Sequence, residues 1–298
     1  MDKKLIALQR RIDRWVTEEA AAFDEAAEGE ESYVLGEDPK LYFFPVGELY
    51  DLSFFGEGFD DYPELPGVEI EEDAPQAAYC AFLDLICGRK EAERVYALTF
   101  DGPDEGANGM KLWDLSRMIR SGAVFSKLKH LRFRLRGAEA HNICVLTAEG
   151  EDEYRANGTL GAVLRQMPAL ESLTIPSAPD RSFFEGGRHP LRRLTLQSGL
   201  DSGDFIRNLA TCDRFPELEE LDFTDLLRRE EVDEACEAVT FEACRMLVEA
   251  RRTLPALREI TLRRTALDRA EREALRRLRP EVRVRFDGTT DEEGGLGE

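Results

Sequence analysis

The residues best suited to chemistry in this 298-residue sequence are carboxylates grouped in two stretches that also contain glycine. Asp60 and Asp61 lie in the first stretch, and Asp101 and Asp104 lie in the second. Carboxylate oxygens are ligands for Ca²⁺ and Mg²⁺, so a metal-assisted enzyme is one candidate function. The first stretch lacks the alternating Asp or Asn ligands and the glutamate at the twelfth position that an EF-hand loop requires. The second is typical of a turn that follows a strand, so we predict no metal site and no cofactor.

Nucleophilic catalysis is not favoured either. The sequence has no G-x-S-x-G, P-loop, G-x-G-x-x-G or H-E-x-x-H motif, and His130, His141 and His189 have no serine or cysteine partner in the pattern. Its cysteines form no C-x-x-C pair, and apolar neighbours predict buried thiols in a reducing compartment, with a disulfide or a reactive thiol as the alternative. They are Cys80, Cys87, Cys144, Cys212, Cys236 and Cys244. We expect a protein that is not an enzyme and has no catalytic residues.

The charge of the chain limits its partners. A formal net charge of -21 opposes binding to nucleic acid and favours a basic protein or peptide. The charge is uneven, because residues 17–75 hold 19 acidic residues and the single base Lys40, whereas residues 245–285 hold 13 arginines and six acidic residues. The acids within the arginine-rich part can form intrahelical ion pairs, and its last helical segment has no aromatic side chain for base stacking. We therefore predict no binding to nucleic acid.

No segment of the sequence is suited to a membrane. No apolar run approaches the roughly 20 residues that span a bilayer, and the basic N-terminus is not followed by the continuous apolar stretch of a signal peptide. We expect a soluble, cytoplasmic protein that does not bind membranes.

One short phrase recurs from residue 95 onward and predicts the fold. It has the form apolar-x-x-apolar-x-apolar, and its copies start at Val95, Leu128, Leu170, Leu191, Leu218 and Leu257, with a shortened last copy from Val282 to Phe286. The six full copies start 33, 42, 21, 27 and 39 residues apart. Segments with helical periodicity lie between most of them, at 112–119, 160–167, 205–212, 241–254 and 267–278. Strand, turn and helix are therefore the repeating unit, with an insertion at 134–160.

Such a unit cannot close a hydrophobic core alone. Two inward positions on a short strand and one apolar helix stripe have to be covered by the neighbouring units. We therefore predict an α/β fold in which the units stack into a curved solenoid, with a parallel sheet on the concave side and helices on the convex side.

The residues around three of these strands resemble leucine-rich repeats. They are MPALESLTI at 167–175, FPELEELDF at 215–223 and LPALREITL at 254–262, and residues 275–284 resemble the terminal unit of such proteins. The helical segments make the chain similar to the ribonuclease-inhibitor-like bacterial type, although the asparagine that often follows the strand is missing. The resemblance covers residues 93–287 and implies a leucine-rich-repeat solenoid that binds a protein. We expect an acidic N-terminal cap region at 1–92 and a disordered acidic tail at 288–298.

The residues between and after the strand leucines are expected to face the concave side. They are polar and of mixed sign, which suits many contacts with a folded protein partner. The candidate partner-binding residues are His130, Arg132, Arg134, Thr174, Arg193, Thr195, Gln197, Glu220, Asp222, Thr224, Glu259, Thr261 and Arg263. The alternative is that they are solvated strand residues without a partner. A narrower hypothesis, from charge and fold alone, is an inhibitor or immunity-type protein for a basic toxin or nuclease.

The N-terminal region is expected to cover the open end of the solenoid. Apolar residues between 3 and 27 follow helical spacing, residues 41–46 and 49–55 predict short strands, and residues 75–88 predict a helix. We expect residues 28–75 to dock as a cap across the first repeats, with His130, Arg132 and Arg134 pairing with acidic side chains of that segment. Binding of a ligand by the segment is the alternative.

Overall fold

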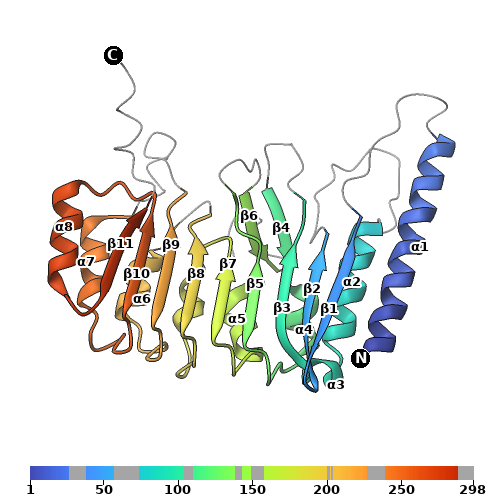
Figure 1. The fold of residues 1–298 in the computed structure, drawn as a ribbon, viewed down its shortest axis with the longest axis horizontal. Coiled ribbons are helices and arrows are strands. Elements are labelled where there is room, and N and C mark those ends of the chain that lie inside the picture. The colour runs from blue at the N-terminus through green and yellow to red at the C-terminus, as the bar shows by residue number, and fades with distance from the viewer. Residues whose placement is uncertain are drawn as a thin grey trace, which may run out of the picture.

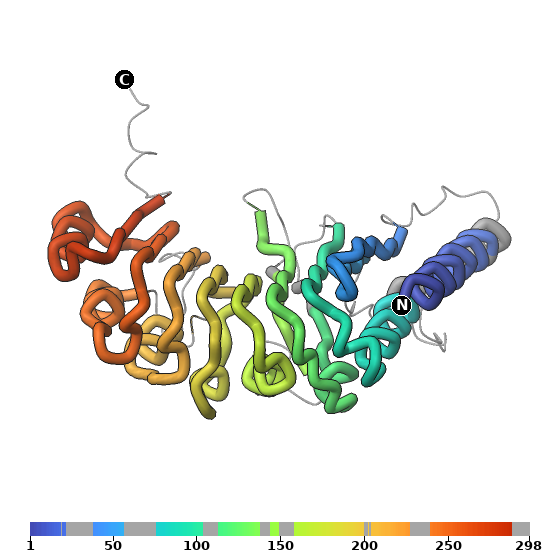
Figure 2. The backbone as a smooth tube through the Cα atoms, turned by 60° about the horizontal axis from the view of Figure 1, so that its bottom comes forward, coloured from blue at the N-terminus to red at the C-terminus, as the bar shows by residue number. Residues whose placement is uncertain are grey.

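The computed structural model describes residues 1–26, 38–56, 74–103, 110–137, 143–148, 158–199, 202, 204–226 and 239–287, which we call the described residues. They form a mixed α/β fold built on an open sheet of nine strands, eight of which run parallel (Figure 1). The sheet curves along its length, and helices lie along the outer side of the curve (Figure 2). None of the described helices lies on the opposite face of the sheet, which we call the open face.

The recurring phrases form neighbouring strands of this sheet, as predicted. Strand β1 is antiparallel to β2, and every later neighbour is parallel. In spatial order the strands are β1 (Lys40–Val46), β2 (Leu49–Phe55), β3 (Val95–Asp101), β5 (His130–Phe133), β7 (Ser172–Ile175), β8 (Arg193–Gln197), β9 (Glu220–Thr224), β10 (Glu259–Arg263) and β11 (Arg283–Asp287).

Apart from α1, which precedes the first strand, the helices lie in connections between strands, and they line one face of the sheet (Figure 1). They are α1 (Asp2–Ala26), α2 (Ala74–Ile86), α3 (Arg89–Ala92), α4 (Ser116–Ser121), α5 (Thr159–Gln166), α6 (Phe205–Thr211), α7 (Phe241–Glu249) and α8 (Arg269–Leu278), with a short 3₁₀ helix η1 (Arg181–Phe184). Apart from the segment at 112–119, the helices predicted from periodicity are present.

Alternation of side chains along each strand places the core on the helix side. Leu98, Leu131 and Leu173 pair in register across β3, β5 and β7, and the row continues through β11. The rest of the row is Leu194, Leu221, Ile260 and Val284. All seven side chains are buried. Because the side-chain period of a strand is two, burying this row directs the intervening polar residues to the open face.

Aromatic rings fill the core below the first strands. The ring of Phe100 on β3 stacks on Phe133 of β5 with centroids 4.7 Å apart, and it contacts Trp113 at 5.6 Å. Tyr79 and Phe82 of α2 each lie 6.1 Å from the same ring. This cluster joins the N-terminal helices to the sheet, so the part of the chain before residue 93 and the part after it share one core.

The helix predicted at 112–119 is wrong in its first half. Residues Met110–Asp114 form a strand, β4, which pairs in parallel with β6 (Ile143–Thr147) from the predicted insertion. A side-chain oxygen of Asp114 accepts a hydrogen bond from the backbone N–H of Ser116 at 2.8 Å, so the helix α4 begins only there. The apolar spacing of this stretch fits a helix locally, but the pairing with β6 is long-range and no local window contains it.

The N-terminal strands form as predicted but extend the sheet. The hairpin β1–β2 pairs with β3, and the backbone N–H of Leu41 donates to Oε1 of Gln9 on α1 at 2.7 Å. Arg134, one of the residues expected to pair with this region, forms an ion pair with Asp101 at 3.2 Å. Residues 28–37 and 57–73 of the expected cap, and the tail at 288–298, lie outside the described residues.

Within the described ranges, we find no helix that combines the length and the apolar character needed to cross a bilayer.

Candidate functional site

The thirteen residues predicted to bind a partner come together on adjacent strands. Twelve lie in β5, β7, β8, β9 and β10, and Arg134 directly follows β5. Two rows of side chains run across the open face in register. The first row contains His130, Ser172, Arg193, Glu220, Glu259 and Arg283, and the second contains Arg132, Thr174, Thr195, Asp222, Thr261 and Arg285. Gln197, Thr224 and Arg263 pair in a third row.

Two of the thirteen residues are buried and present almost no surface to a partner. Gln197 is 5% exposed and Thr261 is 6% exposed. The side-chain amide of Gln197 donates to the backbone carbonyl of Arg136 at 2.8 Å and accepts from its N–H at 2.8 Å. Gln197 therefore fastens the chain that follows β5 to the end of β8. This structural role corrects its assignment as a contact residue.

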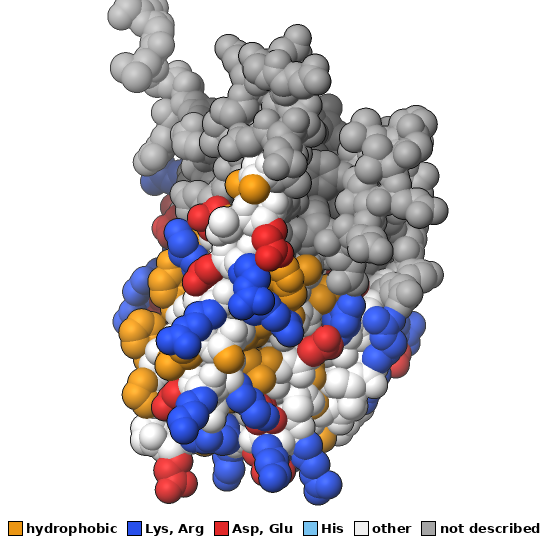
Figure 3. Space-filling model, turned by 90° about the vertical axis from the view of Figure 1, so that its right-hand side faces the viewer, with side chains coloured by type: hydrophobic (Ala, Val, Ile, Leu, Met, Phe, Trp, Pro, Cys, Tyr) orange, Lys and Arg blue, Asp and Glu red, His pale blue; other side chains and the backbone are white. Residues whose placement is uncertain are grey.

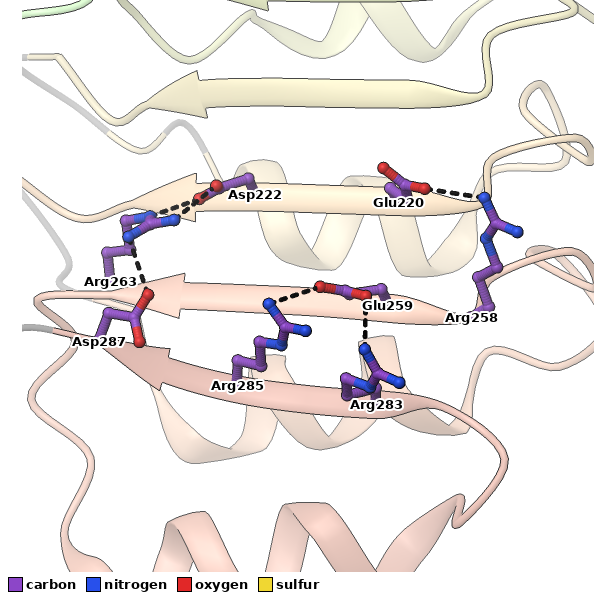
Figure 4. A network of polar contacts seen from close by, with 8 residues as sticks. All are labelled: Glu220, Asp222, Arg258, Glu259, Arg263, Arg283, Arg285 and Asp287. Atoms are coloured by element: carbon purple, nitrogen blue, oxygen red, sulfur yellow. Dashed lines mark hydrogen bonds and ion pairs between the residues drawn. The ribbon is translucent and has the colours of Figure 1, made fainter.

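The C-terminal part of the open face is an ion-pair network within this chain (Figure 4). Arg263 donates from Nε and Nη2 to the two carboxylate oxygens of Asp222 at 2.8 and 2.9 Å. Its Nη1 donates to Asp287 at 2.8 Å. Such fork-to-fork geometry fixes both side chains, and the hydrogen bonds that Arg263 donates to the Asp222 carboxylate raise the pKa of Arg263.

The other acidic residues of the face are engaged in the same way. Glu220 lies 2.8 Å from Nη2 of Arg258, and Glu259 lies 3.2 Å from Arg285 and 3.6 Å from Arg283 (Figure 4). The acids expected to attract a basic partner, Glu220, Asp222 and Glu259, are thus already paired with arginines of β10, β11 and the turn before β10.

Two of these arginines were missed in the sequence. Arg283 and Arg285 alternate with Val284 and Phe286, and this period of two indicates a strand with both arginines on one face. This alternation is visible in the sequence, but the shortened last copy of the phrase was interpreted only through its apolar positions.

We predict that replacing Arg263 by methionine lowers the free energy of unfolding by about 1 kcal/mol at low salt. The change leaves the half-buried carboxylate of Asp222 without its bidentate partner, and partial exposure keeps the loss small. Urea denaturation measures it. Arg269, which is highly exposed and lies 3.4 Å from Glu273, is the matched control, and its change to methionine should have less than about a third of the effect. Equal losses in the two variants would show that the network adds nothing.

The middle of the open face differs, because two of its arginines have no acidic partner among the described residues. Arg132 on β5 and Arg193 on β8 are exposed and form no ion pair within the described residues. Between them lie the small hydroxyl side chains of Thr174 and Ser172 on β7. The centre of the face therefore carries uncompensated positive charge.

His130 reports this positive environment. Burial is the main cause that lowers the pKa of His130, and the nearby charge of Arg193 lowers it further. Glu171 and Asp51 act in the opposite direction but do not outweigh these effects. The imidazole packs edge-on against the ring of Tyr96 with centroids 5.3 Å apart. His130 is thus a largely neutral part of the surface at pH 7.

The negative net charge of the chain does not give the local charge of the open face. The described residues contain 37 lysines and arginines and 32 acidic residues. The remaining residues therefore contain three lysines and arginines and 29 acidic residues. The described residues between 110 and 199 contain 13 bases and four acids. At the α1 end of the molecule, Lys and Arg side chains gather with hydrophobic side chains between them (Figure 3). Charges are screened over about 10 Å in salt, so the charge close to a contact governs its strength.

The candidate metal-assisted chemistry gains no support from the geometry. Among the described residues, no three His, Cys, Asp or Glu side chains are grouped as metal ligands. Asp101 is paired with Arg134, and Asp60, Asp61 and Asp104 lie outside the described residues.

The cysteines of the described part of the chain are free thiols, and the histidine at position 189 is buried. None of these five cysteines forms a disulfide, and burial raises the pKa of Cys87 to about 11 and that of Cys244 to about 12. The ring of His189 is buried, and its Nε2 lies 3.1 Å from the carbonyl oxygen of Met167. Burial lowers the pKa of His189 to about 4. Protonated thiols are poor nucleophiles, so the geometry gives no support to Cys87 or Cys244 as a reactive thiol. Cys236 and His141 lie outside the described residues.

Comparison with known proteins gives no function for the open face. No family model matches the chain, and no curated protein matches it. A crystal structure of a Bacteroides fragilis protein is similar over 69% of this chain and 68% of its own, with 18% identity and a TM-score of 0.30. A likeness of that size carries no inference about fold or function.

Proposed function

We propose that this chain is a non-catalytic protein-binding module whose open face contacts a protein partner. The observation that carries the proposal is a face of nine paired strands that none of the described helices covers and that presents ordered polar side chains in register. Eight strand spacings of about 4.8 Å give a width of about 38 Å, and five residues per strand give an area of about 600 Å². A standard protein interface uses about 800 Å² per partner, so this face supplies most of one.

The fold behind this face is proposed to be a leucine-rich-repeat solenoid of the ribonuclease-inhibitor-like type. Support comes from the strand phrase, whose first two leucine positions are buried in each full copy, and from the helices on the outer side of the curve. The row from Leu98 to Val284 gives each unit the same place in the core. Stacked units that share one core in this way favour the solenoid over an ordinary doubly wound sheet, in which helices cover both faces.

The net charge favours a basic partner at long range, as for an inhibitor or immunity-type protein that binds a basic toxin or nuclease. The acidic side chains of the open face do not add to this preference, because Glu220, Asp222 and Glu259 are paired with arginines of the same chain. The proposal is therefore that a protein partner binds the open face, and it does not depend on the charge of the partner's contacting surface.

The proposal predicts that a photo-crosslinker at Thr174 captures protein from native lysate at least fivefold more efficiently than one at Arg269. Thr174 lies in the middle of the open face, whereas Arg269 lies on the outer helix α8. Benzoylphenylalanine at each position, followed by mass spectrometry of the adducts, provides the measurement. Equal capture at the two positions, or capture at Arg269 alone, would contradict binding through the face.

A further inference from the structure

The unpaired arginines of the open face distinguish its centre from its surroundings. Arg134 pairs with Asp101, and Arg192 pairs with Glu219 at 3.0 Å. Arg132 and Arg193 have no such partner among the described residues. Long arginine side chains in a folded protein usually find a carboxylate when one is near, so two exposed guanidinium groups on one face leave donors for an external anion.

The spacing of these two groups suits two carboxylates of an extended chain. Their strands are separated by β7 alone, which corresponds to about 10 Å across the sheet. Three residues of an extended segment cover the same distance at about 3.3 Å each. Thr174 and Thr195, which lie beside Arg132 in the second row, are small and leave room for a backbone to lie on the sheet.

An apolar stripe lies at the N-terminal edge of the same face. Tyr42, Phe44 and Val46 alternate along β1 and are 48%, 63% and 42% exposed. This stripe lies in the same cross-strand rows as the two arginines. Tyr42 is opposite Ser53 of β2, Ser53 is opposite Thr99 of β3, and Thr99 is opposite Arg132. Three strand spacings, about 14 Å, separate the stripe from β5. Large exposed apolar side chains gathered on one face mark an interaction site.

We propose that the open face binds an acidic segment of a partner protein, with two carboxylates on Arg132 and Arg193 and an aromatic or aliphatic side chain on the stripe of β1. The inference rests on the proposed function and adds the chemistry of the partner. Charge complementarity supports it, because the described residues around β5, β7 and β8 are mainly basic and the acids of β9 and β10 on this face, Glu220, Asp222 and Glu259, are already paired. A nucleic acid fits less well, since a phosphate backbone needs a longer track of cations.

The test selects random twelve-residue peptides on the immobilised full-length protein. The expected peptides are enriched in Asp and Glu together with Phe, Tyr, Trp or Leu. The best peptide, carrying a fluorescent label, is then titrated by polarisation. The double change Arg132→Glu and Arg193→Glu should raise its Kd at least tenfold, and Phe44→Ser should raise it at least threefold.

The matched control is the double change Arg269→Glu and Arg277→Glu on α8, which alters the net charge by the same amount. Both side chains are highly exposed, so neither double variant perturbs the core, and the control should change the Kd less than twofold. Equal losses in the two double variants would overturn the inference. So would a labelled oligonucleotide that displaces the peptide and binds more tightly than it does.

Failure of this inference is distinguishable from failure of the proposed function. Selection of basic peptides that depend on Glu220 and Asp222 would overturn the acidic partner while leaving protein binding at the open face intact. The absence of any peptide that depends on this face would count against both.

Discussion

Replacing Phe100 by alanine is expected to lower the free energy of unfolding by about 4 kcal/mol, which is near the upper end for a buried phenylalanine. The ring is fully buried and has four aromatic neighbours, from two strands and one helix. Its removal leaves a cavity between the sheet and α2 that neighbouring rings cannot fill without leaving their own contacts. Guanidinium denaturation followed by tryptophan fluorescence measures the loss, because Trp113 lies 5.6 Å from the deleted ring.

Phe44 provides a matched control for this change. It is also a strand phenylalanine, but it is largely exposed on β1, and its change to alanine should cost less than about 1 kcal/mol. A small effect at Phe100 would mean that α2 and the sheet do not share a core in solution. A large effect at Phe44 would mean that the stripe on β1 is covered.

Replacing Gln197 by alanine is expected to lower the free energy of unfolding by about 2 kcal/mol. The change deprives both backbone groups of Arg136 of their partner and removes a buried side chain, although partial access of water to that backbone limits the loss. Amide hydrogen exchange should show faster exchange at Arg136, and thermal denaturation gives the overall effect.

Thr195 is the appropriate control, since it lies two residues earlier on the same strand and face and makes no side-chain hydrogen bond with the described residues. Its change to alanine should alter stability by less than about 0.5 kcal/mol. If Gln197→Ala were as mild as Thr195→Ala but impaired partner binding, the residue would be a contact residue after all.

The parallel sheet was predictable because its signal is local and repeated. Each copy of the phrase places two apolar residues on one side of a short strand, and the row from Leu98 to Val284 shows that all copies use the same side. Residues 41–46 and 49–55 were predicted as strands from their aromatic content. Their place in the sheet was not, because pairing with β3 depends on the direction of the hairpin and not on its composition.

The candidate site was predictable in its members but not in its contacts. Reading every second residue of each strand locates Arg263, Asp222 and Glu259 on one face, but only the register shows which carboxylate meets which guanidinium. Gln197 was misassigned for a similar reason, since its partner Arg136 lies 61 residues away in a segment without periodicity. The pairing of β4 with β6 is equally long-range.

The reversed direction of β1 has a consequence for self-association. A parallel array with two open edges is a template for joining copies end to end into filaments, since the last strand of one copy could continue the first strand of the next. Here the first edge runs against the other eight strands, and Gln9 already occupies one of its amides. The geometry that repeats from strand to strand is therefore interrupted at that edge, which disfavours polymerisation by simple continuation of the repeat.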